Sequence, residues 1–283
     1  ATYRGQQSPI EDKVSLSTPK SVTLQGNLFE EFTAEGQGDE KKSILKSLKT
    51  INSDYQLIDT EEKRRELYEI LITSKILALD TETTSTDPID AELVGMSFSI
   101  KENQAFYVPV PPNYDEAQKI VKEFQPIFEN EEILKVGQNM KYDLLVLGNY
   151  GVELRGPMFD TMIAHYVLQP ELRHNMDYLA EIYLNYETIR IEELIGAKGK
   201  NQGNMRDLPA EAVYKYACED ADITLKLHHV LKKELHDSGA TSLFYDIEMP
   251  LVPVLAYMER NGVRIDTDAL KETSQHFTER MNQ

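Results

Sequence analysis

The chain has 283 residues, of which 41% are hydrophobic, and a formal net charge of −18. This hydrophobic fraction is typical of a globular protein, and no apolar run approaches the roughly 20 residues that a membrane-spanning helix needs. The acidic balance excludes a broadly basic nucleic-acid surface, but not nucleic acid itself, because bound cations can reverse the field of an acidic site. Cys218 is the only cysteine, so no intramolecular disulfide can form, and a reducing, cytoplasmic setting is expected.

Residue patterns predict an irregular start, an α/β core and C-terminal helices. Residues 1–54 carry scattered Gly, Ser, Pro and Gln with little periodicity, which favours a flexible tether. The expected strands are 76–83, 93–100, 104–110 and a short one near 134–138. The expected helices are 61–72, 114–128, one after 139, 159–168, 176–183, 209–235 and 242–261, with a loop-rich segment between 186 and 209. This order predicts an α/β domain with a mixed sheet flanked by helices.

The strand at 76–83, with the sequence ILALDTET, ends in two carboxylates. Side chains in a strand alternate between faces, so Asp80 and Glu82 project to the same side and lie close together. Two like charges at the end of an apolar strand repel each other and resist ionisation. The pair therefore needs a partner of opposite charge.

The helix at 209–235 carries a third unusual carboxylate. On its helical wheel Asp220 falls in the middle of the apolar stripe, and Tyr216 lies one turn earlier on the same face. Glu219 and Asp222 fall on the opposite arc and are expected to face water, where Asp222 can pair with Lys226 four residues later.

A fourth carboxylate lies just after the short strand near 134–138. Asn139 is expected to cap the following helix, and Asp143 then shares a face with apolar residues of that helix. An aspartate in a first helical turn is also favoured by the helix dipole, so Asp143 alone can be structural.

Together these residues predict a metal site. Four buried carboxylates are costly without partners, and the sequence shows no buried Lys or Arg pattern that would neutralise them. Mg²⁺ prefers carboxylate, water and phosphate oxygens, and two such ions about 4 Å apart are the usual arrangement for in-line displacement at phosphorus.

The same residues lie in segments that resemble a known family. LALDTETTSTDP, VGQNMKYD and YKYACEDAD are similar, in chain order, to the three motifs of the DEDDy 3′–5′ exonucleases. The linking text, including NYGVELRGPMFDTMIAHYVLQP and RHNMDYLAEIYL, resembles the proofreading domain of bacterial family A DNA polymerases. The resemblance implies a ribonuclease H-like exonuclease domain over 55–238 and the truncated beginning of a polymerase domain over 239–283, without a polymerase active site.

By this resemblance, a set of five residues carries catalysis. Asp80, Glu82 and Asp220 would ligate the first metal, and Asp143 with Asp80 would hold the second, largely through water. Tyr216 would orient the attacking water and help to deprotonate it. Mg²⁺ is the implied cation, with Mn²⁺ or Zn²⁺ as substitutes. The implied reaction is hydrolysis of the terminal phosphodiester at a DNA 3′ end, in a bacterial, nucleoid-associated setting.

The resemblance also indicates contacts to the DNA strand. Thr83 and Tyr142 would line the terminal-nucleotide pocket, and Asn139 and Arg173 would lie near the bound strand. Lys200, with Lys198, could meet phosphates from a glycine-rich loop. Ile191 occupies a place where relatives often carry an aromatic residue, and an aliphatic side chain there can wedge against a base but stacks less well.

Two rival functions stay open from sequence. An RNase D-like exoribonuclease would share the four acids and the tyrosine, but its catalytic domain would be followed by helical RNA-binding domains. Here the text at 247–266 instead resembles the first helix of a polymerase domain. A non-catalytic module that docks single strands is disfavoured, because the acid set is complete.

A short motif stands out in the predicted tether. Gln25, Leu28 and Phe29 fit a Q-x-x-L-F pattern that resembles the sliding-clamp-binding peptide of bacterial replication proteins. Leu28 and Phe29 would supply concentrated apolar anchors, as a short binding peptide requires. Packing of these side chains onto the exonuclease domain, or a chance match, is an alternative, since Gly26 replaces the usual second-position apolar residue.

Overall fold

A computed structural model of the protein describes residues 45–199 and 202–283. The strands are β1 (Asp54–Leu57), β2 (Ile76–Thr83), β3 (Leu93–Lys101), β4 (Gln104–Pro109), β5 (Leu134–Gly137) and β6 (Met158–Asp160). The α-helices are α1 (Glu61–Leu71), α2 (Tyr114–Glu123), α3 (Gln125–Phe128), α4 (Met140–Asn149), α5 (Thr161–Leu168), α6 (Met176–Leu184), α7 (Ile191–Ile195), α8 (Ala210–Asp237), α9 (Met249–Asn261) and α10 (Thr267–Met281). A 3₁₀ helix η1 (Met205–Asp207) and a π-helix η2 (Leu243–Glu248) complete the list. Across these two ranges, no helix is both long and apolar enough to cross a membrane.

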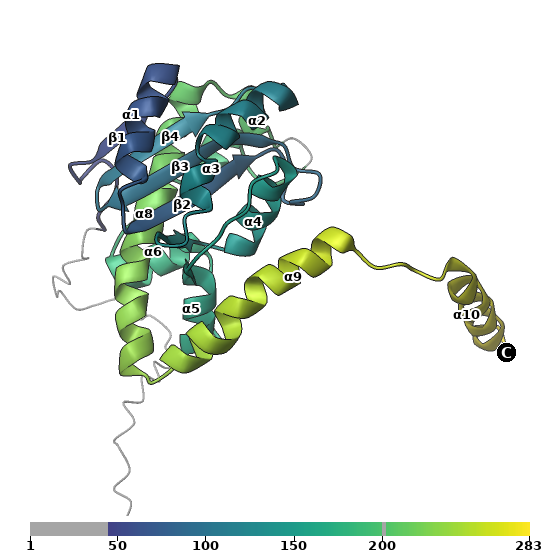
Figure 1. Ribbon diagram of the computed structural model, residues 1–283. Coiled ribbons are helices and arrows are strands. Elements are labelled where there is room, and N and C mark those ends of the chain that lie inside the picture. Colours follow the sequence, from purple (N-terminus) through teal and green to yellow (C-terminus); the bar gives the residue numbers. More distant parts are fainter. Residues whose placement is uncertain (1–44, 200–201) are drawn as a thin grey trace, which may run out of the picture. The chain divides into compact units, whose positions relative to one another are not determined.

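The described strands form one mixed sheet in the order β1-β4-β3-β2-β5-β6. Figure 1 labels β1, β4, β3 and β2. β2, β3 and β4 pair antiparallel, β5 and β6 continue the sheet parallel to β2, and β1 runs parallel to β4 at the other edge. The turn between β3 and β4 places Asn103 at φ 63°, a left-handed conformation that asparagine tolerates in two-residue hairpins. The sheet and its flanking helices confirm the predicted fold class.

The two faces of the sheet bury separate apolar clusters because strand side chains alternate. Leu77 and Leu79 of β2 join the cluster that includes buried residues of α1, α2, α3 and α4. Ala78 projects to the other face, into the cluster formed with α5, α6, α8 and α9. Burial of each leucine contributes roughly 1.5–3 kcal/mol, so this alternation fixes the register of β2. The register in turn decides which face Asp80 and Glu82 occupy.

α8 is the longest helix of the described chain and brings the third acid to the sheet. Its 28 residues span about 42 Å at 1.5 Å per residue. It contacts β1, β2, β3, β4 and β5 on one side and α5 and α6 on another. Apart from the partly exposed Lys226, every residue from Ala217 to His228 is buried, so this part of the helix is enclosed around its whole circumference.

The predicted elements differ from the structure mainly where short segments begin or end. The helix predicted at 114–128 is two helices, because Pro126 lacks an N–H and its ring disfavours a continuous turn. The helix predicted at 159–168 begins at Thr161, and the residues before it form β6. The predicted loop at 186–209 contains α7 and η1. β1 and α10 were not predicted.

The last residues of the predicted tether that the structure describes contact the domain. Lys46 forms a parallel β-bridge with Tyr186, and Ile51 packs against the cluster on the α8 face. β1 begins at Asp54. The domain boundaries given above stay predictions.

α9 is attached to α4 by polar and steric contacts. The Arg260 guanidinium donates to the Leu145 carbonyl oxygen over 2.6 Å, and Lys141 forms an ion pair with Glu259. Gly148 makes this approach feasible, since a Cβ there would lie 2.3 Å from Arg260 Nη2. Because the guanidinium is the end of a flexible side chain, a Cβ at Gly148 would displace it from this position.

A buried histidine in α8 predicts a loss of stability in acid. His228 is 3% exposed and packs edge-on against Phe159, with ring centroids 4.6 Å apart. Within the described residues neither of its ring nitrogens has a hydrogen-bond partner. Burial lowers the pKa of His228 from 6.5 to about 4. The folded state therefore favours the neutral form of His228. The stability that this neutral form contributes is complete above pH 6.5 and is lost as the pH falls towards 4.

We expect the unfolding free energy of the wild type to fall by about 2 kcal/mol more than that of His228→Leu between pH 7.5 and pH 5. Urea unfolding at the two pH values measures this difference. His229→Gln is the matched control, because His229 is exposed and pairs with Glu102. Equal acid losses in the wild type and His228→Leu would show that His228 does not cause the effect.

Candidate active site

The site begins with the two carboxylates of β2. Asp80 lies opposite Ser97 and Glu82 opposite Gly95 on β3, and the register shifts directly after Glu82. A Cβ at Gly95 would lie 2.3 Å from the Tyr107 hydroxyl, so only glycine leaves room for that buried ring beside Glu82. As expected from the alternation of strand side chains, Asp80 and Glu82 face the same way.

α8 adds Asp220 to this pair. One carboxylate oxygen from each of Asp80, Glu82 and Asp220 lies within 4.8 Å of the others, and within the described chain this is the cluster with metal-ligand geometry. Glu82 and Asp220 are 6% and 9% exposed. The sequence prediction that these three acids share one site is thus met by their geometry.

The electrostatics of the cluster favour a bound cation. Burial raises the pKa of Asp80 to about 7. Burial and the facing charge of Asp80 raise the pKa values of Glu82 and Asp220 well above their usual range. Glu82 Oε1 is buried and has no hydrogen-bond partner among the described residues. Three crowded carboxylates with an unpartnered oxygen are a donor set that suits a hard divalent cation.

Tyr216 lies one turn before Asp220, as the helical period predicts. The facing Asp220 carboxylate, together with burial and the charges of Glu82 and Asp80, raises the pKa of the Tyr216 phenol. The phenol is therefore close enough to the three acids for their charges to act on it, and its nearest partner is Asp220.

Asp143 lies apart from the direct cluster. It is 2% exposed on α4, and its Oδ1 accepts a hydrogen bond from the Thr81 hydroxyl over 2.6 Å. Burial and the charge of Asp80 raise its pKa well above the usual range. The sequence analysis did not predict a role for Thr81. The signal was available, because a residue between Asp80 and Glu82 in a strand points to the opposite face of the sheet, which here is the face that α4 covers.

The expected capping role of Asn139 is wrong. Asn139 precedes α4 in the left-handed region, at φ 68° and ψ 48°, and its side chain caps nothing in the described structure. Asp160 does this instead, accepting from the backbone N–H of Asn139 at 3.2 Å and of Met140 at 2.7 Å. Sequence near Asn139 could not indicate this cap, because Asp160 comes from a distant part of the chain. Asp160 ends β6, which pairs with β5, and its side chain reaches the start of α4.

The same carboxylate also caps α5. Asp160 Oδ1 accepts from the backbone N–H groups of Met162 and Ile163 at 2.9 and 3.1 Å. One buried aspartate therefore fixes the beginnings of two helices, including the one that carries Asp143. The signal available in sequence was local: an aspartate directly before a helix is a preferred N-cap.

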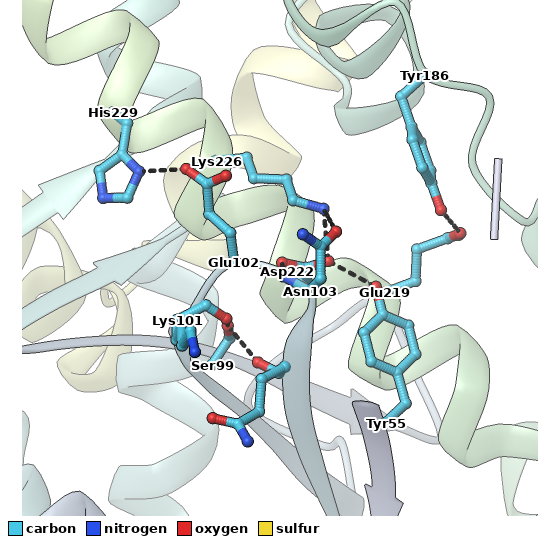
Figure 2. A network of polar contacts seen from close by, with 11 residues as sticks. Tyr55, Ser99, Lys101, Glu102, Asn103, Tyr186, Glu219, Asp222, Lys226 and His229 are labelled. Atoms are coloured by element: carbon cyan, nitrogen blue, oxygen red, sulfur yellow. Dashed lines mark hydrogen bonds and ion pairs between the residues drawn. The ribbon is translucent and has the colours of Figure 1, made fainter. Parts of the chain in front are cut away.

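Glu219 and Asp222 do not face water as the helical wheel predicted. Both side chains are fully buried. Asp222 accepts from the Tyr55 hydroxyl and from Lys226 Nζ, each at 2.7 Å, which confirms the predicted pair with Lys226 (Figure 2). The wheel assumed one solvent-facing arc, whereas this part of α8 is enclosed on all sides. Replacing the buried Asp222 carboxylate is therefore expected to lower stability.

The residues predicted to contact the DNA strand lie in several parts of the structure. The Thr83 hydroxyl contacts the Tyr142 hydroxyl, which also donates to the Ser85 carbonyl oxygen. Arg173 is exposed before α6, and Ile191 is the first residue of α7 and 37% exposed. Lys200 and the motif residues Gln25, Leu28 and Phe29 lie outside the described residues.

Comparison with known proteins identifies the family. A family model described as 3′-5′ exonuclease matches residues 55–236. The chain belongs to this 3′–5′ exonuclease family, as its three acidic motifs predicted.

The chain is similar to part of bacterial DNA polymerases I. It is 42% identical over 218 residues to the DNA polymerase I of Pseudomonas aeruginosa, covering 74% of this chain and 24% of the relative. It is 35% identical over 252 residues to that of Borreliella burgdorferi, covering 84% and 27%. The chain thus spans about a quarter of the length of these relatives.

Solved structures support the fold. The POL domain of Pol1 from M. smegmatis, in complex with DNA primer-template and dNTP, matches with a TM-score of 0.62 and 19% identity over 79% of this chain and 35% of that one. NrnC of Brucella melitensis with bound Mg²⁺ matches with a TM-score of 0.58 and 19% identity over 75% and 95%. The predicted ribonuclease H-like fold is confirmed.

Proposed function

We propose that this domain removes nucleotides from DNA 3′ ends by hydrolysis of the terminal phosphodiester. The observation that carries the proposal is the carboxylate cluster of Asp80, Glu82 and Asp220, within 4.8 Å and beside Tyr216, in a chain of the 3′–5′ exonuclease family. Water attacks the terminal phosphorus, the P–O3′ bond breaks, and a nucleoside 5′-monophosphate leaves. The released 3′ oxygen takes up a proton and becomes the new strand end.

The acids suit two divalent cations, with Mg²⁺ as the physiological choice and Mn²⁺ or Zn²⁺ as substitutes. Asp80, Glu82 and Asp220 would hold one, in keeping with the unpartnered Glu82 oxygen. Asp143 would hold the other together with Asp80, and its separation from the cluster suits contact through water. When bound, such cations lower the pKa of water and neutralise charge that develops on the phosphate.

The chain's own residues orient the reactants. Tyr216 hydrogen-bonds the attacking water and orients it for the loss of its proton, and the raised pKa keeps the phenol itself protonated. The Thr83–Tyr142 contact forms a rigid wall for the terminal nucleotide, since both hydroxyls lie beside β2 at the end that carries the acids. Asn139, Arg173, Ile191 and Lys200 are proposed strand contacts.

The test of this function is a time course on a 5′-labelled, single-stranded or frayed DNA with Mg²⁺. We expect stepwise shortening from the 3′ end and its complete loss with EDTA. A matched RNA substrate tests the exoribonuclease alternative, and the 42% identity to a DNA polymerase I favours DNA. A single product of fixed length would contradict stepwise removal from the 3′ end. Faster cleavage of RNA than of DNA would contradict DNA as the substrate.

The similarity to DNA polymerases I suggests the domain's place in a larger protein. We infer that it serves as the proofreading part of such a polymerase, in the bacterial cytoplasm near the nucleoid. The remainder of a polymerase chain would then be its covalent partner and would deliver frayed 3′ ends to the carboxylate cluster.

A further prediction concerns the Q-x-x-L-F motif, which lies outside the described residues. We expect a labelled peptide spanning residues 21–35 to bind the cognate sliding clamp with micromolar affinity, because Leu28 and Phe29 supply two adjacent apolar anchors. Fluorescence anisotropy measures the binding, and the double variant Leu28→Ala, Phe29→Ala should lose it. No binding at ~100 μM, which corresponds to roughly −5.5 kcal/mol, would contradict the prediction that this motif binds the clamp.

A further inference from the structure

Glu219 is a buried acid directly beside Asp220 that takes no part in the carboxylate cluster. Its Oε1 accepts from the Tyr186 hydroxyl and its Oε2 from the Ile189 N–H, each over 2.6 Å. The nearby Lys226 Nζ pairs instead with Asp222. Hydrogen bonds to a carboxylate are about twice as strong as neutral ones. Glu219 therefore ties segment 186–189 to α8, at the position directly before Asp220.

This segment leads directly into α7. α7 has five residues, and none of them is fully buried. Its last residues, Leu194 and Ile195, pack against the apolar cluster that contains Ala217. Among the described residues, the first residue of α7, Ile191, is not part of that cluster, and it follows Ile189 by two positions. Segment 186–189 is thus one attachment of the beginning of α7 to α8, and the Thr188 hydroxyl also ties it to Asp177 of α6 over 2.7 Å.

Asp222 provides an internal comparison. It is as buried as Glu219 and lies three residues later, and it accepts from the Tyr55 hydroxyl, the Asn103 N–H and Lys226 (Figure 2). Tyr55 belongs to β1 and Asn103 to the turn between β3 and β4. Of these two buried acids, Glu219 is the one that accepts hydrogen bonds from segment 186–189. Asp222 reaches that segment only through Lys226, whose Nζ lies 5.7 Å from the centroid of the Tyr186 ring.

We propose that Glu219 is a positioning residue that fixes Ile191 and the start of α7 at a set distance from the carboxylate cluster, and so sets the affinity for the terminal nucleotide of the strand. The inference rests on the proposed function, since it assigns a substrate-binding consequence to that site. Glu219 touches neither the substrate nor the reacting atoms. It acts through Ile189 and Tyr186.

The main experiment compares Glu219→Ala with Asp222→Ala on a 5′-labelled single strand with Mg²⁺. Glu219→Ala is expected to raise KM about tenfold with kcat within twofold, because the acids stay in place while α7 loses its attachment. Asp222→Ala removes an equally buried carboxylate and should leave KM within twofold. A merely structural role for Glu219 would lower the active fraction, and hence the apparent kcat, without moving KM.

The conservative variant and a double variant sharpen the test. Glu219→Gln should restore KM to within threefold, since its amide oxygen can accept from Ile189 N–H and its amide nitrogen can donate to the Tyr186 oxygen. Ile191→Ala should raise KM, and in a Glu219→Ala background it should add little. Fully additive effects of these two changes would overturn the proposal that Glu219 acts through α7.

A milder pair covers the case in which the alanine variants do not fold. Tyr186→Phe and Tyr55→Phe each remove one hydroxyl from one of the two buried acids. Hydrogen exchange should become faster at Ile189 and across α7 in Tyr186→Phe and stay unchanged there in Tyr55→Phe. Equal exchange in both variants would overturn the proposal. Hydrogen exchange does not depend on activity. If the wild type had no exonuclease activity, the proposed function would be wrong, and hydrogen exchange would still test whether Glu219 positions α7.

Discussion

Replacing Asp80 with alanine is expected to lower the rate of 3′-end hydrolysis by at least ~10³-fold. Asp80 belongs to the direct carboxylate cluster, and its charge also acts on Asp143, so both proposed cation positions depend on it. Calorimetric titration should show weaker Mn²⁺ binding by the variant. Asp220→Ala should behave alike, whereas Tyr216→Phe should lower the rate and keep the affinity for Mn²⁺, because the phenol orients water.

The stability of the metal-free variant distinguishes this effect from misfolding. The charge of Asp80 raises the pKa values of Glu82, Asp143 and Asp220, so these groups repel one another in the folded state. Removing one charge relieves that repulsion, and the unfolding free energy of Asp80→Ala in EDTA should equal or exceed that of the wild type. A variant that is inactive and also less stable in EDTA, or one with near wild-type rate, would contradict the assignment.

The acids of the cluster were predictable because their placement depends on local periodicity. Asp80 and Glu82 follow from the two-residue period of a strand whose apolar run is unbroken, and Asp220 and Tyr216 follow from the helical period of α8. Each period needs only neighbouring residues to be read. The sequence also identified the family, since three motifs occur in order.

The side chains that support the cluster were not predictable in the same way. The wheel placed Glu219 and Asp222 in water because it assumed that a helix with charged residues has a solvated face. In the structure α8 is enclosed by the sheet, by α5 and α6, and by the segment before α7, so its surrounding partners come from distant parts of the chain. The Asn139 cap failed for the same reason, since the group that caps α4 is the carboxylate of Asp160, from a strand about 20 residues away.

Asp160→Ala is expected to lower the unfolding free energy by about 3 kcal/mol, as the sum of two lost helix caps of roughly 1–2 kcal/mol each. Its carboxylate accepts four backbone N–H groups, of Asn139, Met140, Met162 and Ile163. Burial nevertheless raises the pKa of Asp160, which means that desolvation outweighs these bonds. This offset is the reason to expect about 3 kcal/mol rather than the larger penalty of four orphaned donors.

Urea unfolding at pH 7.5 measures the change, and Asp115→Ala is the control. Asp115 lies in the first turn of α2, near a helix start as Asp160 is, but it is exposed and should change stability by no more than about 0.5 kcal/mol. A loss of 3 kcal/mol is a large part of the 5–15 kcal/mol typical of a domain. Because α4 starts at this cap and carries Asp143, folded Asp160→Ala protein at low temperature should also show a reduced rate. A change below about 1 kcal/mol would mean that water replaces the carboxylate at both helix ends, and that α4 does not depend on β6 for its position.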